Sequence, residues 1–131
     1  QFIQDVKIVI GSRSTKGAKI KYKQPLSRIF SGKIFNFIVT KYLGLNYKDT
    51  QCGFKLFEGK TIKDILKNCT INRFCIDVEI LFIAKKLNIK VTEIGIKWSN
   101  FYPSSVKIFS DSLNMFFNIL KIKYNNYNIK K

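Results

Sequence analysis

The 131-residue sequence contains no histidine and only three cysteines. Without histidine the chain cannot form a Ser-His or Cys-His nucleophile pair, and it cannot form a His-ligated metal site. The cysteines, Cys52, Cys69 and Cys75, form no Cys-x-x-Cys pair and are odd in number. This usage argues against a disulfide framework or a zinc site and indicates a reducing compartment.

Long apolar runs are also missing. No window approaches the roughly 18 unbroken apolar residues that a membrane span needs. The first residues, QFIQDVKIVIG, show neither an initiator Met nor the organisation of a signal peptide. We therefore expect a chain cut from a longer one and beginning at a strand. A hydrophobic content of 46% over this length predicts one folded domain with a core of its own.

Acidic residues are scarce: 8 stand against 24 basic residues, which gives a formal net charge of +16. Such a charge suits nucleic acid, a phosphorylated substrate or a membrane surface, but a coding bias toward Lys, Asn and Ile is the simpler origin of most of it. Only Arg13, Arg28 and Arg73 are arginines. Because a guanidinium grips phosphate or carboxylate with a planar fork, each arginine is a candidate ligand-binding residue.

The apolar pattern alternates between strands and helices, which predicts an α/β fold. Pro25 is placed to open the first helix at its first position and Gly44 to close it, and Thr61 is placed to cap the second helix. The apolar spacing of the first helix predicts an amphipathic helix. Strands are expected at 6–10, 53–57 and 90–98, and helices at 26–42, 61–66, 77–87 and 113–124.

Three polar clusters could carry chemistry. The GSR string, 11–13, follows the first strand, at the strand end where open α/β sheets bind ligands, and it begins a basic loop that could hold a phosphate or could simply be solvated. In the DTQCG string, 49–53, Asp49 either lines a ligand site or caps its own turn. In the RFCIDVE string, 73–79, Asp77 is either a helix cap or a functional acid.

In chain order, GSR, LSRIF, DTQCGFKLF, RFCIDVEILFIA and EIGIKW, then a serine-bearing loop and a late Met, resemble the C-terminal half of the dolichyl-phosphate β-glucosyltransferases. These are family 2 glycosyltransferases of the GT-A fold. The resemblance runs from about residue 6 to residue 124. It implies that residues 1–131 are the C-terminal portion of a single Rossmann-like α/β catalytic domain, with a mixed sheet flanked by helices and the N-terminal nucleotide-binding half absent.

The resemblance implies transfer of glucose from UDP-glucose to dolichyl phosphate, with inversion, at the cytosolic face of the endoplasmic reticulum membrane. This reaction serves lipid-linked oligosaccharide assembly and protein N-glycosylation. By position, the resemblance implies catalytic roles for Asp49, Asp77 and Glu79. It implies contacts with the substrates or their phosphates for Ser12, Arg13, Arg28, Gln51, Arg73 and Ser104.

Two departures from the family matter. The resemblance implies Mg²⁺ or Mn²⁺ in the full-length enzyme, but these 131 residues contain no Asp-x-Asp motif to hold it, so the chain alone should be inactive. After the tryptophan strand the family carries Gly-Ser-Lys, whereas residues 103–105 read Pro-Ser-Ser, which leaves substrate contacts from that loop open.

Several readings of the surface stay open. The final helix, with MFFNILKIKY, suits docking at a membrane surface or packing on its own sheet. The alternatives to the enzyme are a basic nucleic-acid-binding module and an inactive remnant with a scaffolding role. No nucleic acid is expected, because the sequence contains no RNP string, zinc finger or helix-turn-helix motif.

Overall fold

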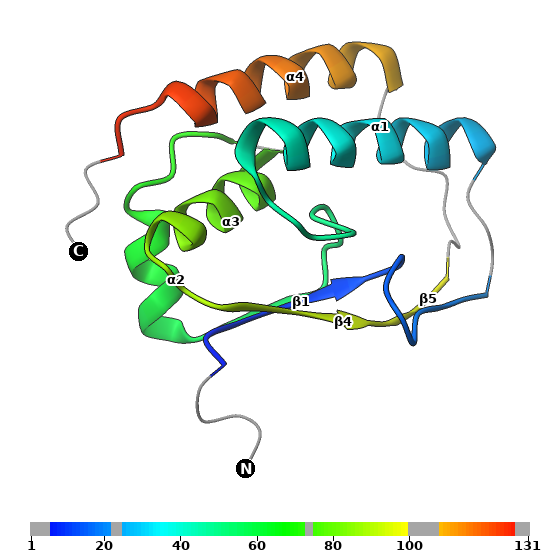
Figure 1. The fold of residues 1–131 in the computed structure, drawn as a ribbon, viewed down its shortest axis with the longest axis horizontal. Coiled ribbons are helices and arrows are strands. Elements are labelled where there is room, and N and C mark those ends of the chain that lie inside the picture. The colour runs from blue at the N-terminus through cyan, green and yellow to red at the C-terminus, as the bar shows by residue number, and fades with distance from the viewer. Residues whose placement is uncertain (1–5, 22–24, 73–74, 100–107, 128–131) are drawn as a thin grey trace.

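The computed structural model describes residues 6–21, 25–72, 75–99 and 108–127. Helices α1 and α4 lie side by side and run in the same direction, on one side of the strands (Figure 1). Along the described chain the elements are β1 (Ile8–Ser12), β2 (Lys19–Ile20), α1 (Leu26–Leu43), β3 (Lys55–Phe57), α2 (Gly59–Leu66), α3 (Ile76–Lys86), β4 (Val91–Gly95), β5 (Lys97–Trp98) and α4 (Ile108–Tyr124).

Strand β1 is the centre of a three-stranded mixed sheet. It pairs antiparallel with β3 and parallel with β4, in the order β3-β1-β4. Ile8 faces Phe57 on one side and Val91 on the other. Ile8 and Ile10 are fully buried, so their side chains form part of the hydrophobic core. The mixed sheet with its helices confirms the predicted α/β fold.

A second, two-stranded sheet was not expected from the sequence. Strand β2 pairs parallel with β5, and the backbone N–H of Lys21 donates to the carbonyl of Trp98 at 3.0 Å. This pairing divides the predicted strand 90–98, because β4 pairs with β1 only as far as Gly95. A Cβ at Gly95 would lie 2.5 Å from the carbonyl oxygen of Lys16, so glycine permits the basic loop to fold back here. Two-residue strands carry too little periodicity to be read from sequence.

Helix α1 matches its predicted limits closely. Pro25 takes the N-cap position and not the first helical position that was predicted for it, and Gly44 closes the helix in the left-handed region at φ 64°. The backbone N–H of Gly44 donates to the carbonyl of Thr40 at 3.0 Å, which is the ordinary role of a C-terminal glycine.

The prediction that α1 is a simple amphipathic helix is wrong. Its fully buried residues are Val39 and Leu43 alone. Apolar side chains surround the helix, so those that the core does not take face solvent instead. The exposed ones are Leu26, Phe30, Ile34, Phe37 and Tyr42, between 43% and 83% accessible.

Helix α2 starts at Gly59, two residues before the expected cap. Glu58 is its N-cap position, and the hydroxyl of Thr61 donates to the Glu58 carboxylate instead of capping the helix backbone. Helix α3 has the predicted limits within one residue, but its N-cap position is Cys75 and not Asp77. Every residue from 78 to 84 is buried, which makes α3 the central helix of the core.

Helix α4 is longer than predicted and packs against α1 and α3. Met115, Ile119 and Ile122 are buried in the same core cluster as α1 and α3. The thiol of Cys75 donates to the carbonyl of Met115 at 3.6 Å. The buried face of α4 therefore packs on α1 and α3. The alternative that this helix packs on the sheet is not what the structure shows. None of the helices in the described ranges is long and apolar enough to cross a bilayer.

Candidate functional site

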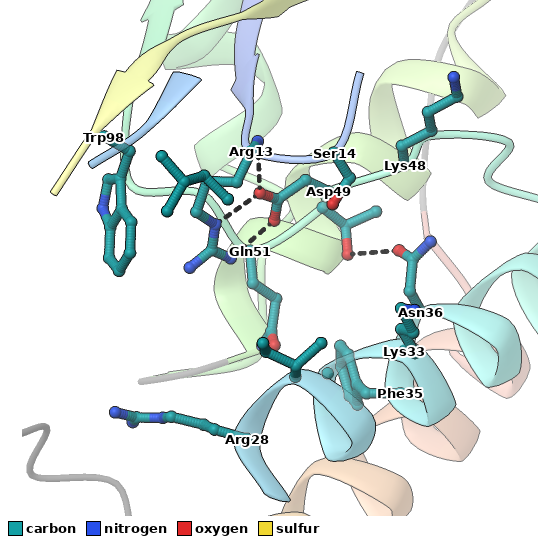
Figure 2. Close-up of a pocket in the computed structure, with 14 residues that line it drawn as sticks. Arg13, Ser14, Arg28, Lys33, Phe35, Asn36, Lys48, Asp49, Gln51 and Trp98 are labelled. Carbon is teal, nitrogen blue, oxygen red and sulfur yellow. Dashed lines mark hydrogen bonds and ion pairs between the residues drawn. The ribbon is translucent and has the colours of Figure 1, made fainter. Parts of the chain in front are cut away.

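A pocket of about 370 Å³ lies between α1 and the loop that precedes β3. In Figure 2, Arg28, Lys33 and Asn36 reach it from α1, while Asp49, Gln51 and Arg13 form the opposite wall. The loop after β1 and strand β5 close one side. The lining residues are Arg13, Ser14, Ile20, Arg28, Ile29, Gly32, Lys33, Phe35, Asn36, Lys48, Asp49, Thr50, Gln51 and Trp98.

The wall of the pocket is built on an ion pair between Arg13 and Asp49. Nε and Nη2 of Arg13 donate to the two carboxylate oxygens of Asp49 at 2.6 and 2.8 Å, and the backbone N–H of Arg13 adds a third bond at 3.0 Å. The guanidinium also lies 5.5 Å from the ring centre of Trp98. The Arg13 side chain is thus held by two partners, the Asp49 carboxylate in a fork-to-fork pair and the Trp98 ring (Figure 2).

The pair keeps Asp49 ionised. Burial by itself raises the pKa of Asp49, but the side-chain and backbone hydrogen bonds from Arg13, with the positive charges of Arg13 and Lys55, outweigh burial and hold the pKa below its ordinary value. The hydrogen bond to Asp49 likewise raises the pKa of Arg13. Asp49 accepts these bonds from a residue 36 positions away, so it is not the cap of its own turn.

The remaining charges of the pocket are positive. Arg28 lies in the first turn of α1, Lys33 lies one and a half turns further along, and Lys48 precedes Asp49. Since Arg13 and Asp49 neutralise each other, these three cations leave the described lining with an excess of positive charge. Such a lining attracts an anion of phosphate or diphosphate size.

Three residues that sequence reasoning missed support the loop carrying Asp49. Glu93 on β4 accepts from the backbone N–H groups of Lys48 and Asp49. Asn36 on α1 donates to the Tyr47 carbonyl at 2.9 Å. Lys55 donates to the carbonyl of Cys52. No local motif marks Glu93 and Asn36, because they act on backbone groups that the fold brings near from 44 and 11 positions away. Lys55 acts on a backbone group three positions away, and a lysine at the start of a strand carries no signal of that role.

The structure brings four of the predicted site residues together and separates others. Arg13, Arg28, Asp49 and Gln51 line one pocket. Ser12 is fully buried at the end of β1, where its hydroxyl accepts from the backbone N–H of Ser14 at 3.2 Å. Arg73 and Ser104 lie outside the described residues.

Asp77 and Glu79 do not line this pocket. The Asp77 carboxylate pairs with Nζ of Lys55 at 3.1 Å. Glu79 is fully buried and accepts from the backbone N–H groups of Thr70 and Ile71 and from the Tyr127 hydroxyl at 2.8 Å. Their catalytic roles therefore stay predictions, while the geometry gives both acids contacts that tie segments of the fold together.

The described residues do not fit the divalent metal that the family resemblance implies. Among them, no three His, Cys, Asp or Glu side chains gather closely enough to hold an ion. Both oxygens of Asp49 already accept from Arg13. Burial raises the pKa of Cys69 to about 12 and that of Cys75 to about 11, so these thiols are poor metal ligands at neutral pH. All three cysteines are free, as the cysteine spacing predicted.

The chain is similar over most of its length to known glycosyltransferases. A dolichyl-phosphate beta-glucosyltransferase of Dictyostelium discoideum is 36% identical over 121 residues, which are 92% of this chain and 37% of the relative. One from Trichomonas vaginalis is 38% identical over 115 residues, 88% of this chain and 34% of the relative. One from Drosophila melanogaster is 31% identical over 116 residues, 86% of this chain and 34% of the relative.

No protein-family model matches the chain, and no solved structure matches it. The mixed sheet with flanking helices is consistent with a GT-A-type domain, the fold expected from the resemblance. The chain spans about a third of the length of the curated relatives that it matches. Over that third, the chain is homologous to the dolichyl-phosphate β-glucosyltransferases.

Proposed function

We propose that this chain forms the phosphate-binding side of a protein that transfers glucose from UDP-glucose to dolichyl phosphate, with inversion, for lipid-linked oligosaccharide assembly and N-glycosylation. The observation that carries the proposal is the cationic pocket, found in a region homologous to enzymes of that name. Three cations and an immobilised arginine on one small cavity suit a phosphate better than a neutral ligand.

The chemistry asks more for position and charge than for a strong base. A phosphate monoester is already ionised at neutral pH, so its oxygen attacks C1 of glucose without first losing a proton. The bond from C1 to the diphosphate of UDP breaks as the new bond forms. Arg28, Lys33 and Lys48 supply positive charge near the attacking phosphate. Asp49, with a lowered pKa and both oxygens engaged, acts by holding Arg13 and not as a general base.

The reaction is tested on the complete protein that contains this chain, with UDP-glucose, dolichyl phosphate and Mg²⁺ or Mn²⁺. Glucosyl lipid is measured after extraction into organic solvent, and GDP-mannose serves as the control donor. Formation of a glycosylated lipid with UDP-glucose but not with GDP-mannose supports the proposal. Complete absence of glucosyl lipid contradicts it. A salt-sensitive shift of arbitrary RNA, with no response to dolichyl phosphate, would favour the nucleic-acid-binding alternative.

Two matched variants test the arginine of the pocket. Arg28 and Lys33 both lie on α1 and both line the cavity, so Arg28→Ala and Lys33→Ala remove one charge from similar places. A guanidinium can bind two phosphate oxygens at once, whereas an ammonium acts as a point charge. We expect Arg28→Ala to reduce glucosyl transfer by about tenfold more than Lys33→Ala. Equal losses would contradict a specific role for the arginine.

We also propose that α1 and α4 dock on an anionic membrane surface, where a lipid acceptor resides. The support is an apolar layer with positive charges beside it. On α1, Phe30 and Phe37 are 67% and 62% exposed, and on α4, Phe117 is 64% exposed. Helix α1 contains no Asp or Glu, and α4 ends with Lys121 and Lys123. Exposed aromatics beside lysines are typical of helices that lie in a membrane interface.

Sedimentation with vesicles tests this surface. The chain is mixed with phosphatidylcholine vesicles that contain or lack about a third of phosphatidylserine, and the bound fraction is measured. We expect binding to the anionic vesicles, weakened by Phe30→Ser. Phe54→Ser is the control, because Phe54 is 60% exposed but precedes β3, away from the two helices. Equal binding of both variants would place the contact elsewhere.

The remaining parts of the proposal concern the whole protein. Because the described residues of this chain do not fit a divalent metal, we propose that Mg²⁺ or Mn²⁺ is held by other parts of the protein. We propose that the protein works at the cytosolic face of the endoplasmic reticulum membrane, and that this chain alone does not turn over.

A further inference from the structure

The loop that carries Asp49 is ordered without belonging to a helix or strand. Residues 44–54 form turns and irregular backbone between α1 and β3. Asp49 is nevertheless only 6% exposed and Thr50 only 1%. Something other than secondary structure must therefore hold this loop in place, because buried backbone groups need hydrogen-bond partners.

At the start of the loop the partner is the carboxylate of Glu93. Its Oε1 accepts from the backbone N–H of Lys48 at 2.9 Å and from that of Asp49 at 3.0 Å. Its Oε2 lies 3.2 Å from the Lys48 nitrogen. Glu93 sits in β4 opposite Ile10 of β1, which places it at the middle of the β1–β4 pairing.

At the end of the loop the partner is the ammonium of Lys55. Its Nζ donates to the carbonyl of Cys52 and pairs with the Asp77 carboxylate at 3.1 Å. The Lys55 side chain is only 4% exposed, so this contact is shielded from water. The loop is thus fastened to β4 at one end and to α3 at the other.

Electrostatics alone does not explain Glu93. It accepts from neutral backbone amides, and it lies close in space to a second anion, since one of those amides belongs to Asp49. A further negative charge beside a pocket with a positive lining lowers the attraction for an anion. What Glu93 does supply is geometry: it fixes the backbone from which Asp49 reaches Arg13, and Arg13 in turn lies against Trp98.

We propose that Glu93 is a positioning residue of the pocket, which holds the Lys48–Asp49 backbone so that the Asp49–Arg13 pair shapes the wall for a phosphate-bearing ligand. This inference rests on the proposed function, because it takes the pocket to be an anion site. Asp77 belongs to the same support at the other end of the loop, where it holds Lys55.

The proposal and a simple charge effect predict opposite signs. If Glu93 acted only through its charge, both Glu93→Ala and Glu93→Gln would bind an anion more tightly than the wild-type chain. If Glu93 positions the loop, Glu93→Ala binds the anion more weakly in spite of the more positive pocket. Glu93→Gln recovers most of the affinity, because the side-chain amide keeps an oxygen that accepts from the same backbone N–H groups.

The experiment is titration of the chain with inorganic pyrophosphate, followed by the fluorescence of Trp98. Trp98 is the single tryptophan of the sequence and lines the pocket, so its emission reports directly on the site. We expect an affinity about tenfold lower for Glu93→Ala and within about threefold of wild type for Glu93→Gln. Asp64→Ala is the control: it removes the same charge from an exposed pair with Lys67 on α2, outside the pocket lining.

Amide hydrogen exchange of Lys48 and Asp49 gives a second readout that needs no ligand. We expect both amides to exchange at least about tenfold faster in Glu93→Ala, and at the wild-type rate in Asp64→Ala. If Glu93→Ala does not fold, Glu93→Gln carries the test: we expect its Lys48 and Asp49 amides to exchange faster than in wild type, and its pyrophosphate affinity to be no higher than that of wild type.

Each outcome decides something. Unchanged exchange in Glu93→Ala overturns the positioning role, as does equal or tighter pyrophosphate binding by both Glu93 variants. If pyrophosphate causes no saturable change in the Trp98 fluorescence of the wild-type chain, the pocket is not an anion site, and the proposed function is contradicted. In that case the exchange rates still show whether Glu93 holds the loop.

Discussion

The Arg13–Asp49 pair provides the sharpest test of how this pocket is built. Asp49 is 6% exposed and Arg13 is 27% exposed, so Asp49 depends on Arg13 far more than Arg13 depends on Asp49. Arg13→Met leaves a buried carboxylate that has lost two side-chain hydrogen bonds and keeps only the bond from the backbone of residue 13. Asp49→Ala leaves a guanidinium that can turn toward water.

The magnitudes follow from this asymmetry. A hydrogen bond to a charged group contributes about 1.5–3 kcal/mol, and removing one partner of a buried pair costs about 3–5 kcal/mol. Because Arg13 is partly exposed, we expect the lower part of this range, about 3 kcal/mol, for Arg13→Met. Asp49→Ala should cost about 1–2 kcal/mol less. The double variant should recover part of the loss, with a coupling energy of about 1.5–3 kcal/mol.

Urea denaturation of the four proteins measures these free energies of unfolding. Far-UV circular dichroism is the primary signal, because Trp98 lies against Arg13 and its fluorescence will change with the substitution itself. Equal m-values across the four proteins would show that the comparison is made between the same two states. A coupling energy below about 0.5 kcal/mol would refute the reasoning, since the two side chains would then be independent.

Three further predictions concern other parts of the chain. The pKa of Asp49 is lowered in the folded protein, so its contribution to stability is present above about pH 4 and is lost as the pH falls below about 4. Asp49→Asn should therefore weaken the loss of stability at acid pH, measured by thermal unfolding across a pH series. Gly95→Ala should lower the free energy of unfolding by at least about 2 kcal/mol, since its Cβ would lie 2.5 Å from backbone atoms. Gly53→Ala, with open space around the added Cβ, should change the free energy of unfolding by less than about 1 kcal/mol in the same urea titration. Similar losses for the two variants would contradict the close contact at Gly95. Glu79→Gln should destabilise by about 2–4 kcal/mol, because a side-chain N–H₂ group would face N–H and O–H donors, and unchanged stability would show that Glu79 is available for another role.

Much of the fold could be predicted because local rules set it. Strand β1 and helices α1 and α3 lie within two residues of their expected limits at both ends, since a short β-branched run and helical apolar spacing each have one structural solution. The helix-closing role of Gly44 was equally local. The two-residue strands β2 and β5 could not be read in this way, because their pairing depends on where the loop after β1 returns.

The residues of the candidate site could likewise be predicted only in part. Sequence reasoning selected Arg13, Arg28 and Asp49 from their residue type and their order along the chain. It could not select Glu93, which is one of eight acids in the chain and acts on backbone groups 44 residues away. It also grouped Glu79 with the site, whereas the fold turns that carboxylate toward Thr70, Ile71 and Tyr127.

By itself, the sequence determined the α/β class, the limits of the longer elements, the positive charge and the family to which the chain is similar. These follow from periodicity, composition and the order of short strings, which survive without knowledge of contacts. The tertiary structure decided which apolar side chains of α1 are buried, and which acid meets which donor. Periodicity tells which residues share a face of a helix, but strand order and helix packing decide what that face meets. The role of a carboxylate is set by donors from distant segments, and only the folded chain brings Arg13 to Asp49.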